Sequence, residues 1–230
     1  MLLIRMLIAC LALLALTSGL HGQDRSDIKS LIDQLASKNK PPKVRIAVEP
    51  FAVFPLDFDW KDQDRIIAII ESLTSKVDSD WTAFLDHMND QRYCITTESD
   101  QSASNATVGS VCSLLLVNAI VAGYEDCKID DRKMMTKVLY PMSPKLLREY
   151  LEENRDKKLV DIQKGFLMIA IKEAKVLDFK DDKEKAALLE RFDARLSLLN
   201  SSGKSILPKN SIFDKEYRSV ITRDRAVFMK

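Results

Sequence analysis

The sequence predicts a mainly α-helical protein with one minor β element. Apolar residues recur at the spacing of one helix face in seven stretches. These make up about half of the chain after residue 23, more than the third typical of globular proteins. Several of the stretches follow a capping Ser, Thr or Asp, and only residues 43–49 alternate clearly between apolar and polar side chains. We therefore expect an all-α architecture of packed amphipathic helices, irregular and repeat-like, beside a short β element.

Residues 1–23 predict a cleavable secretory signal peptide. Arg5 supplies a positive charge, an apolar run covers residues 6–16, and small residues follow. The run is too short for a membrane-spanning helix, which needs about 20 residues. Cleavage is expected near Gly19 or near Gly22. The mature protein is then secreted or periplasmic, with no stable membrane span.

The first half of the remaining chain combines helices with the expected β element. The first helix is capped by Ser26 and ends before the Pro41-Pro42 pair. Residues 50–60 are apolar and aromatic, so we expect a connection that packs onto the domain. Residues 98–107 are polar and predict a loop. Helices are expected at 27–37, at 62–75, at 81–88 after a cap at Ser79 or Asp80, and at 108–123 after a cap at Thr107, with short strands at 43–49 and 93–97.

The second half predicts helices only. Ser143 and Pro144 form a typical helix start, a cap followed by a proline in the first turn. Long helices are expected at 159–177 and 181–199, the second ending in the turn 200–203. The tail 204–230 has no firm period. We expect one α-helical domain over residues 24–230, with a soft internal boundary near 139–143.

Charge and histidine content narrow the chemistry. The chain has 35 Lys and Arg and 34 Asp and Glu, and only Arg5 is lost with the signal, so the mature formal charge is zero. A neutral balance argues against a nucleic-acid partner. Of two histidines, His21 lies in the signal and His87 remains. We expect no metal and no cofactor, and a His87–Cys94 catalytic pair is less favoured than a capping or solvent-facing histidine.

Three cysteines remain after cleavage, Cys94, Cys112 and Cys127. A disulfide between Cys94 and Cys112 would close a loop of 17 residues and add about 3 kcal/mol in the chain-entropy model. Three free, buried thiols are the alternative. Cys10 lies inside the signal in a segment that resembles a lipoprotein acylation site, but apolar residues continue after it, which favours an ordinary signal residue.

Three further motifs are weighed against simpler explanations. Residues 201–205 resemble the end of a phosphate-binding P-loop, but Leu198 stands where that motif needs glycine, so a helix C-terminal turn is favoured. Residues 57–64 hold four aspartates without the spacing of a calcium loop, and helix N-terminal charges explain Asp62 and Asp64. Asn105 and Asn200 each begin an N-glycosylation acceptor pattern.

Two blocks carry a resemblance to known proteins. Residues 26–42 followed by the helix at 62–75 resemble one helix pair of a HEAT repeat, through the stripe Ile28, Leu31, Ile32 and Leu35 and the prolines after it. Residues 90–112 are similar to uncharacterised exported bacterial proteins, some with helical repeats. That resemblance implies a location in the bacterial envelope, and no reaction or catalytic residue.

The leading functional hypothesis is an exported binding or scaffolding module without a catalytic site. It rests on stacked amphipathic helices and on the lack of a convincing catalytic motif in the sequence. The expected partner is a protein, and the oligomeric state is left open. Two alternatives are an envelope hydrolase that uses carboxylates or Cys94, and a thiol-based redox or assembly factor.

Overall fold

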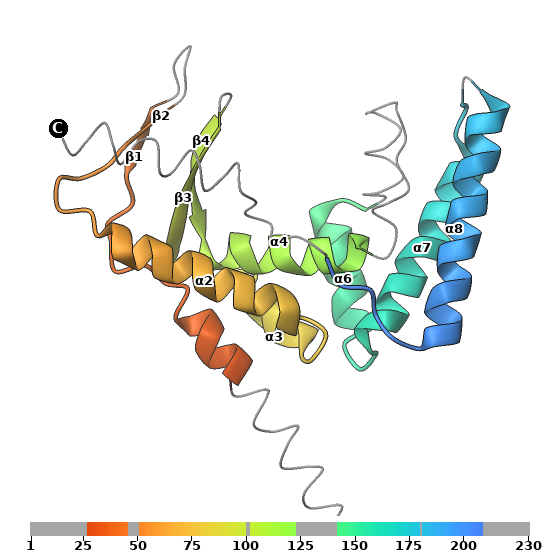
Figure 1. The fold of residues 1–230 in the computed structure, drawn as a ribbon, viewed down its shortest axis with the longest axis horizontal. Helices are drawn as coiled ribbons and strands as arrows, with labels where there is room; N and C mark the ends of the chain where they lie inside the picture. The colour runs from red at the N-terminus through yellow and green to blue at the C-terminus, as the bar shows by residue number, and fades with distance from the viewer. Residues whose placement is uncertain (1–26, 46–50, 100–101, 123–141, 180, 209–230) are drawn as a thin grey trace, which may run out of the picture.

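The fold is mainly helical, as the sequence predicts, and its β content is two small antiparallel sheets of two strands each rather than one short element (Figure 1). The computed structural model describes residues 27–45, 51–99, 102–122, 142–179 and 181–208. Most of the buried apolar side chains of these residues, from Ile28 to Leu199, form one hydrophobic cluster, to which Phe58 does not belong. Among these described segments there is no helix with the length and apolar character needed to cross a bilayer.

The first sheet pairs β1 (Lys43–Arg45) with β2 (Phe51–Val53), with Lys43 opposite Val53. The strand predicted at 43–49 is confirmed over 43–45, and residues 46–50 lie outside the described part. Residues 50–60 are predicted to be a connection, and this is wrong for residues 51–53, which form β2. These residues become a strand because the backbone groups of β1 need a partner, and residues 51–53 are β-compatible and close in sequence.

The second sheet is a hairpin of β3 (Tyr93–Ser99) and β4 (Ser102–Thr107). The β segment at 93–97 is confirmed, whereas the loop predicted over 98–107 is wrong. Polar side chains stabilise this hairpin directly. Thr96 Oγ1 donates to Asn105 Oδ1 (2.7 Å), and Asn105 Nδ2 donates to the Pro42 carbonyl (2.8 Å), which ties β4 to the segment before β1.

Two helices contact the hairpin and a third packs on one of them farther from it, and together they surround the central core (Figure 1). They are α2 (Trp60–Lys76), α3 (Trp81–Asp86) and α4 (Val108–Val121), of which α3 is the one that packs on α4. Each begins after a side-chain cap, formed by Asp59, Asp80 and Thr107 respectively. The predicted caps Asp80 and Thr107 are confirmed, and α2 starts two residues earlier than predicted because Asp59 caps it. The short helix 27–33 buries Ile28 and Ile32 beside them, and its predicted cap Ser26 lies outside the described residues.

The remaining helices are α6 (Pro144–Glu153), α7 (Leu159–Val176) and α8 (Asp182–Ser202). The predicted cap Ser143 is confirmed. Helix α8 runs three residues beyond the predicted 199 and ends at Gly203, with φ at 60°, the last residue of the predicted turn 200–203. Helices α7 and α8 pack side by side and stand at one end of the molecule (Figure 1). The soft boundary expected near 139–143 falls largely on residues outside the described part.

Gly165 of α7 lets α6 approach closely, because the Tyr150 hydroxyl lies where a Cβ would stand. We expect Gly165→Ala to destabilise the protein by about 1–2 kcal/mol through this overpacking. A Tyr150→Phe substitution removes the clashing oxygen, so the double variant should recover most of the loss in urea denaturation. Equal stability of the two Gly165→Ala proteins, with and without Tyr150→Phe, would contradict this account.

Side chains of α3 and α7 join the two halves of the fold. Trp81 Nε1 donates to the Lys157 carbonyl (2.9 Å) just before α7, and Arg155 pairs with Asp86 (2.6 Å). Gln163 is fully buried in α7. Its Nε2 donates to the Ala119 carbonyl (2.7 Å) in α4 and to the Ile206 carbonyl (2.6 Å), and its Oε1 accepts from Ile206 N (3.0 Å). One side chain therefore links α4, α7 and the segment after α8.

Candidate interaction surface

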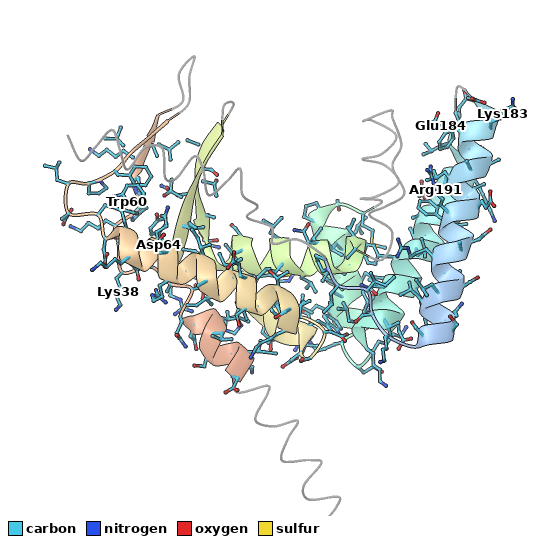
Figure 2. All side chains as sticks on the ribbon, in the orientation of Figure 1. Lys38, Trp60, Asp64, Lys183, Glu184 and Arg191 are labelled. Atoms are coloured by element: carbon cyan, nitrogen blue, oxygen red, sulfur yellow. The ribbon has the colours of Figure 1, made fainter. Side chains whose placement is uncertain are left out.

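Three aromatic rings pack together where the chain passes from β2 into α2. The ring centroids of Phe54, Phe58 and Trp60 lie 4.7–4.9 Å apart, in tilted or edge-to-face arrangements. Such pairs add about 0.5–1.5 kcal/mol each beyond the area they bury. These three rings thus pack against one another, and Figure 2 shows Trp60 at the end of α2 nearest the β1–β2 sheet.

The same segment carries the most exposed large apolar side chain of the described residues. Leu56 has a relative exposure of 110 %, and the nearby Val53 is 37 % exposed. We call Val53, Phe54, Leu56, Phe58 and Trp60 together the apolar tip. A single exposed leucine is common on protein surfaces, but an apolar side chain presented beside a packed aromatic cluster is typical of interaction sites.

Acidic side chains border the apolar tip. Asp57 and Asp59 flank Phe58 in the sequence and are exposed. Asp59 is held in place by Asn39, whose Nδ2 donates to the Asp59 carbonyl (2.9 Å) and whose Oδ1 accepts from Asp59 N (2.7 Å). These paired hydrogen bonds anchor the end of the segment, so the apolar tip leaves the domain in a defined direction.

The four aspartates of residues 57–64 do not form one site. Asp62 points inward, where it accepts hydrogen bonds from Ser37 Oγ (2.7 Å), the Lys38 amide (2.8 Å) and the Arg65 guanidinium (2.8 Å). In the segments that the structure describes, no three metal-ligating side chains gather. The assignment of Asp62 to the first turn of α2 is confirmed.

Asp62 gives the protein a predicted pH dependence. Burial raises the pKa of this carboxyl, but hydrogen bonds from Ser37, Arg65 and the Lys38 amide outweigh burial and leave the pKa lowered. A carboxyl with a lowered folded-state pKa stabilises the fold above its ordinary pKa of about 4, and this contribution is lost as the pH falls through the folded-state value. Asp62→Asn should therefore lower stability at pH 7 and flatten the acid limb of unfolding curves, and Ser37→Ala should do so less. An unchanged acid limb in Asp62→Asn would count against this role.

The cysteines of the predicted disulfide, Cys94 in β3 and Cys112 in α4, are buried and free in the structure. Burial raises the pKa of both thiols to about 12, and the nearby Cys112 adds to the rise in the pKa of Cys94. A nucleophilic cysteine needs a lowered pKa and access to substrate, and Cys94 has neither. His87 ends α3, and its Nδ1 lies 2.9 Å from the Ala83 carbonyl, within its own helix. Cys127 lies outside the described residues.

The thiol state of Cys94 and Cys112 has a direct chemical readout. If both are thiols, iodoacetamide at pH 8 should leave them unmodified in the native protein, because they are buried and protonated, and should modify both in urea without reductant. Peptide mass mapping separates them from Cys10 and Cys127. If they form the predicted disulfide, modification in urea will require prior reduction. Rapid modification of native Cys94 would contradict the buried-thiol description.

Two other predicted motifs have clear positions. Residues 201–205 form the end of α8 and the turn after it, the arrangement expected of a helix terminus. Asn105 of the first glycosylation pattern uses its amide in the hydrogen bonds of the hairpin, whereas Asn200 of the second is exposed in the last turn of α8.

Comparison of the chain with protein-family models, with curated proteins and with solved structures finds no match. The function therefore has to be argued from the surface and the sites of this fold.

Proposed function

We propose that this chain is an exported binding module that docks a protein partner on its apolar tip. The observation that carries the proposal is the complete exposure of Leu56 beside a packed aromatic cluster. Leucine loses favourable burial energy when it stays in water, about 1.5–3 kcal/mol for the whole side chain. That energy becomes available when a partner covers it.

The apolar tip is suited to docking because little of it has to be ordered on binding. Phe58 is almost fully buried and Phe54 and Trp60 are half-buried, so their ring positions are set before any partner arrives. The Asn39–Asp59 hydrogen bonds fix the segment where it enters α2. Binding to a pre-organised anchor avoids part of the entropy cost of association.

The charges around Leu56 define the chemistry of the partner. Asp57 and Asp59 are exposed on either side of Phe58, close to the leucine in sequence. Complementarity calls for an apolar pocket bordered by Lys or Arg on the partner.

A photo-crosslinking residue at position 56, introduced into the chain expressed in its own cells, tests the proposal. We expect a specific crosslinked protein that is absent when the crosslinker replaces Val176, an exposed apolar residue of α7. With that protein purified, Leu56→Asp should weaken binding at least about tenfold, the scale of a buried apolar anchor. Val176→Asp should have no such effect. Equal crosslinking at both positions, or unchanged affinity of Leu56→Asp, would refute the role of the tip.

Export has its own test. Mass spectrometry of the protein recovered outside the cytoplasm should find an N-terminus after Gly19 or Gly22. A chain that starts at Met1 and stays in the cytosol would remove the exported part of the proposal and leave the docking surface to be judged separately.

A further inference from the structure

A cavity of about 460 Å³ lies where three distant parts of the chain meet. Its wall is formed by the turn between α2 and α3 with the first residues of α3, by the start of α7, and by residues 203–205 after α8. This volume falls within the range of small-molecule sites, about 300–1,000 Å³. The cavity is on other elements than the apolar tip, and none of its lining residues belongs to the tip.

The wall of the cavity carries an excess of positive charge. Lys157, Lys158 and Lys204 line it, and none of them forms an ion pair within the part of the chain that the structure describes. Two carboxylates are also present. Asp80 uses its Oδ1 to hold the Ala83 amide and the Thr82 hydroxyl at the start of α3, and Asp78 is exposed.

The backbone contributes in the same direction. Helix α7 has 18 residues and begins at the cavity, and Lys158 in its N-cap position makes no side-chain hydrogen bond to the helix amides. The uncapped amides and the helix dipole together favour an anion at this place. The hydrogen bond from Trp81 Nε1 to the Lys157 carbonyl fixes the start of the helix relative to α3.

Two side-chain atoms of the wall, Ser205 Oγ and Asp80 Oδ2, are buried and make no hydrogen bond in the described part of the structure. Of these, only the Ser205 hydroxyl can donate to an anion. A buried hydroxyl without a partner costs about 1–3 kcal/mol, so such groups are usually satisfied by a bound molecule. The backbone supports the same position, because Gly203 adopts a left-handed conformation and turns residues 204–205 back toward α7.

From the cavity, its lysines, the uncapped helix and the unpartnered hydroxyl, we propose that this site binds a small phosphate monoester. The phosphate lies at the start of α7 between Lys158 and Lys204, where the Ser205 hydroxyl can donate to it. The organic part lies against Trp81, Leu159 and Val160, which also line the cavity. This site is independent of the proposed function, since neither needs the other to be occupied.

Isothermal titration calorimetry of the purified mature protein tests the proposal with three probes. Glucose 6-phosphate should bind with one-to-one saturation, inorganic phosphate should bind more weakly because it lacks the organic part, and glucose should not bind. Added salt should weaken both phosphates, since the lysines are exposed. Equal binding of glucose 6-phosphate and inorganic phosphate would limit the site to the bare anion and refute the monoester. No saturable heat with either phosphate would refute the proposal altogether.

Removing a lysine and removing an aspartate from the wall should change the affinity for glucose 6-phosphate in opposite directions. Lys158→Gln and Lys204→Gln should each weaken glucose 6-phosphate binding by about tenfold, and Asp78→Asn should strengthen it, because it removes a repelling charge. Lys175→Gln, at the other end of α7, and Leu56→Asp, in the apolar tip, should leave it unchanged. All variants change exposed residues, and circular dichroism checks that they fold. Unchanged affinity in the Lys158→Gln, Lys204→Gln double variant would overturn the assignment, whatever the outcome at the tip.

Discussion

Replacing Gln163 with leucine is expected to lower the free energy of unfolding by about 3 kcal/mol. The side chain is fully buried and makes three hydrogen bonds, to the Ala119 carbonyl and to both backbone polar groups of Ile206. Leucine has a similar size, so the loss comes from backbone groups left without partners, each worth about 1–3 kcal/mol. Urea denaturation monitored by circular dichroism measures the change.

Gln163→Glu provides a matched control of nearly equal shape. An ionised carboxylate accepts from the Ile206 amide but faces two carbonyl oxygens that it repels. The neutral acid can donate one hydrogen bond, so burial among these groups should raise the folded-state pKa of the new carboxyl. A raised folded-state pKa means that stability is greatest at low pH and falls as the pH rises. A Gln163→Leu protein as stable as wild type would show that the segment after α8 is not held by this residue.

Replacing Gly109 with alanine is expected to cost about 3 kcal/mol, the upper end of ordinary overpacking. A Cβ at this position would stand 2.5 Å from the Met88 carbonyl oxygen and 2.9 Å from the Asp90 amide nitrogen, both of them backbone atoms. The Gly109 amide also donates to the Asp90 carbonyl (2.9 Å), so the start of α4 has little freedom to move away. The unfolding midpoint in urea should fall sharply.

Gly203→Ala separates crowding from backbone conformation. Gly203 has φ at 60°, and nothing lies within 4 Å of an added Cβ, so only the left-handed conformation is penalised, by about 1–2 kcal/mol. Gly109→Ala should therefore be clearly the more damaging change. If Gly203→Ala lowered stability more than Gly109→Ala, the backbone of residues 88–90 would have to move away from α4 at little cost.

Periodicity and caps predicted the helices well, because each helix here obeys a local rule. Ser143, Asp80 and Thr107 all cap where expected, and the stripe Ile66, Ile70 and Leu73 is fully buried in α2. The strands β2 and β4 were not predictable in this way. Each of them is a strand because it pairs with a neighbouring strand, which a local pattern does not show. Ser102–Thr107, for example, contains no large apolar residue and forms a strand through its hydrogen bonds with β3.

The candidate sites were predictable only in part. The apolar content of residues 50–60 predicted packing, and the three rings do pack, but the full exposure of Leu56 depends on where the turn after Pro55 points. The cavity combines Lys158 with Lys204 and the turn before α3. Residues so far apart in the sequence come together only through the tertiary fold, which no local pattern describes.

The polarity of β4 has a consequence for behaviour at high concentration. In the part of the chain that the structure describes, β4 forms a backbone ladder with β3 alone, although its residues also contact β1 and β2. A strand edge outside a ladder can recruit other chains. Ser104 and Asn105 are exposed there, and asparagine is depleted in strands and offers no apolar surface, so this segment is a weak template for added strands. The serine and asparagine content that makes this strand hard to recognise thus also guards the folded molecule against aggregation.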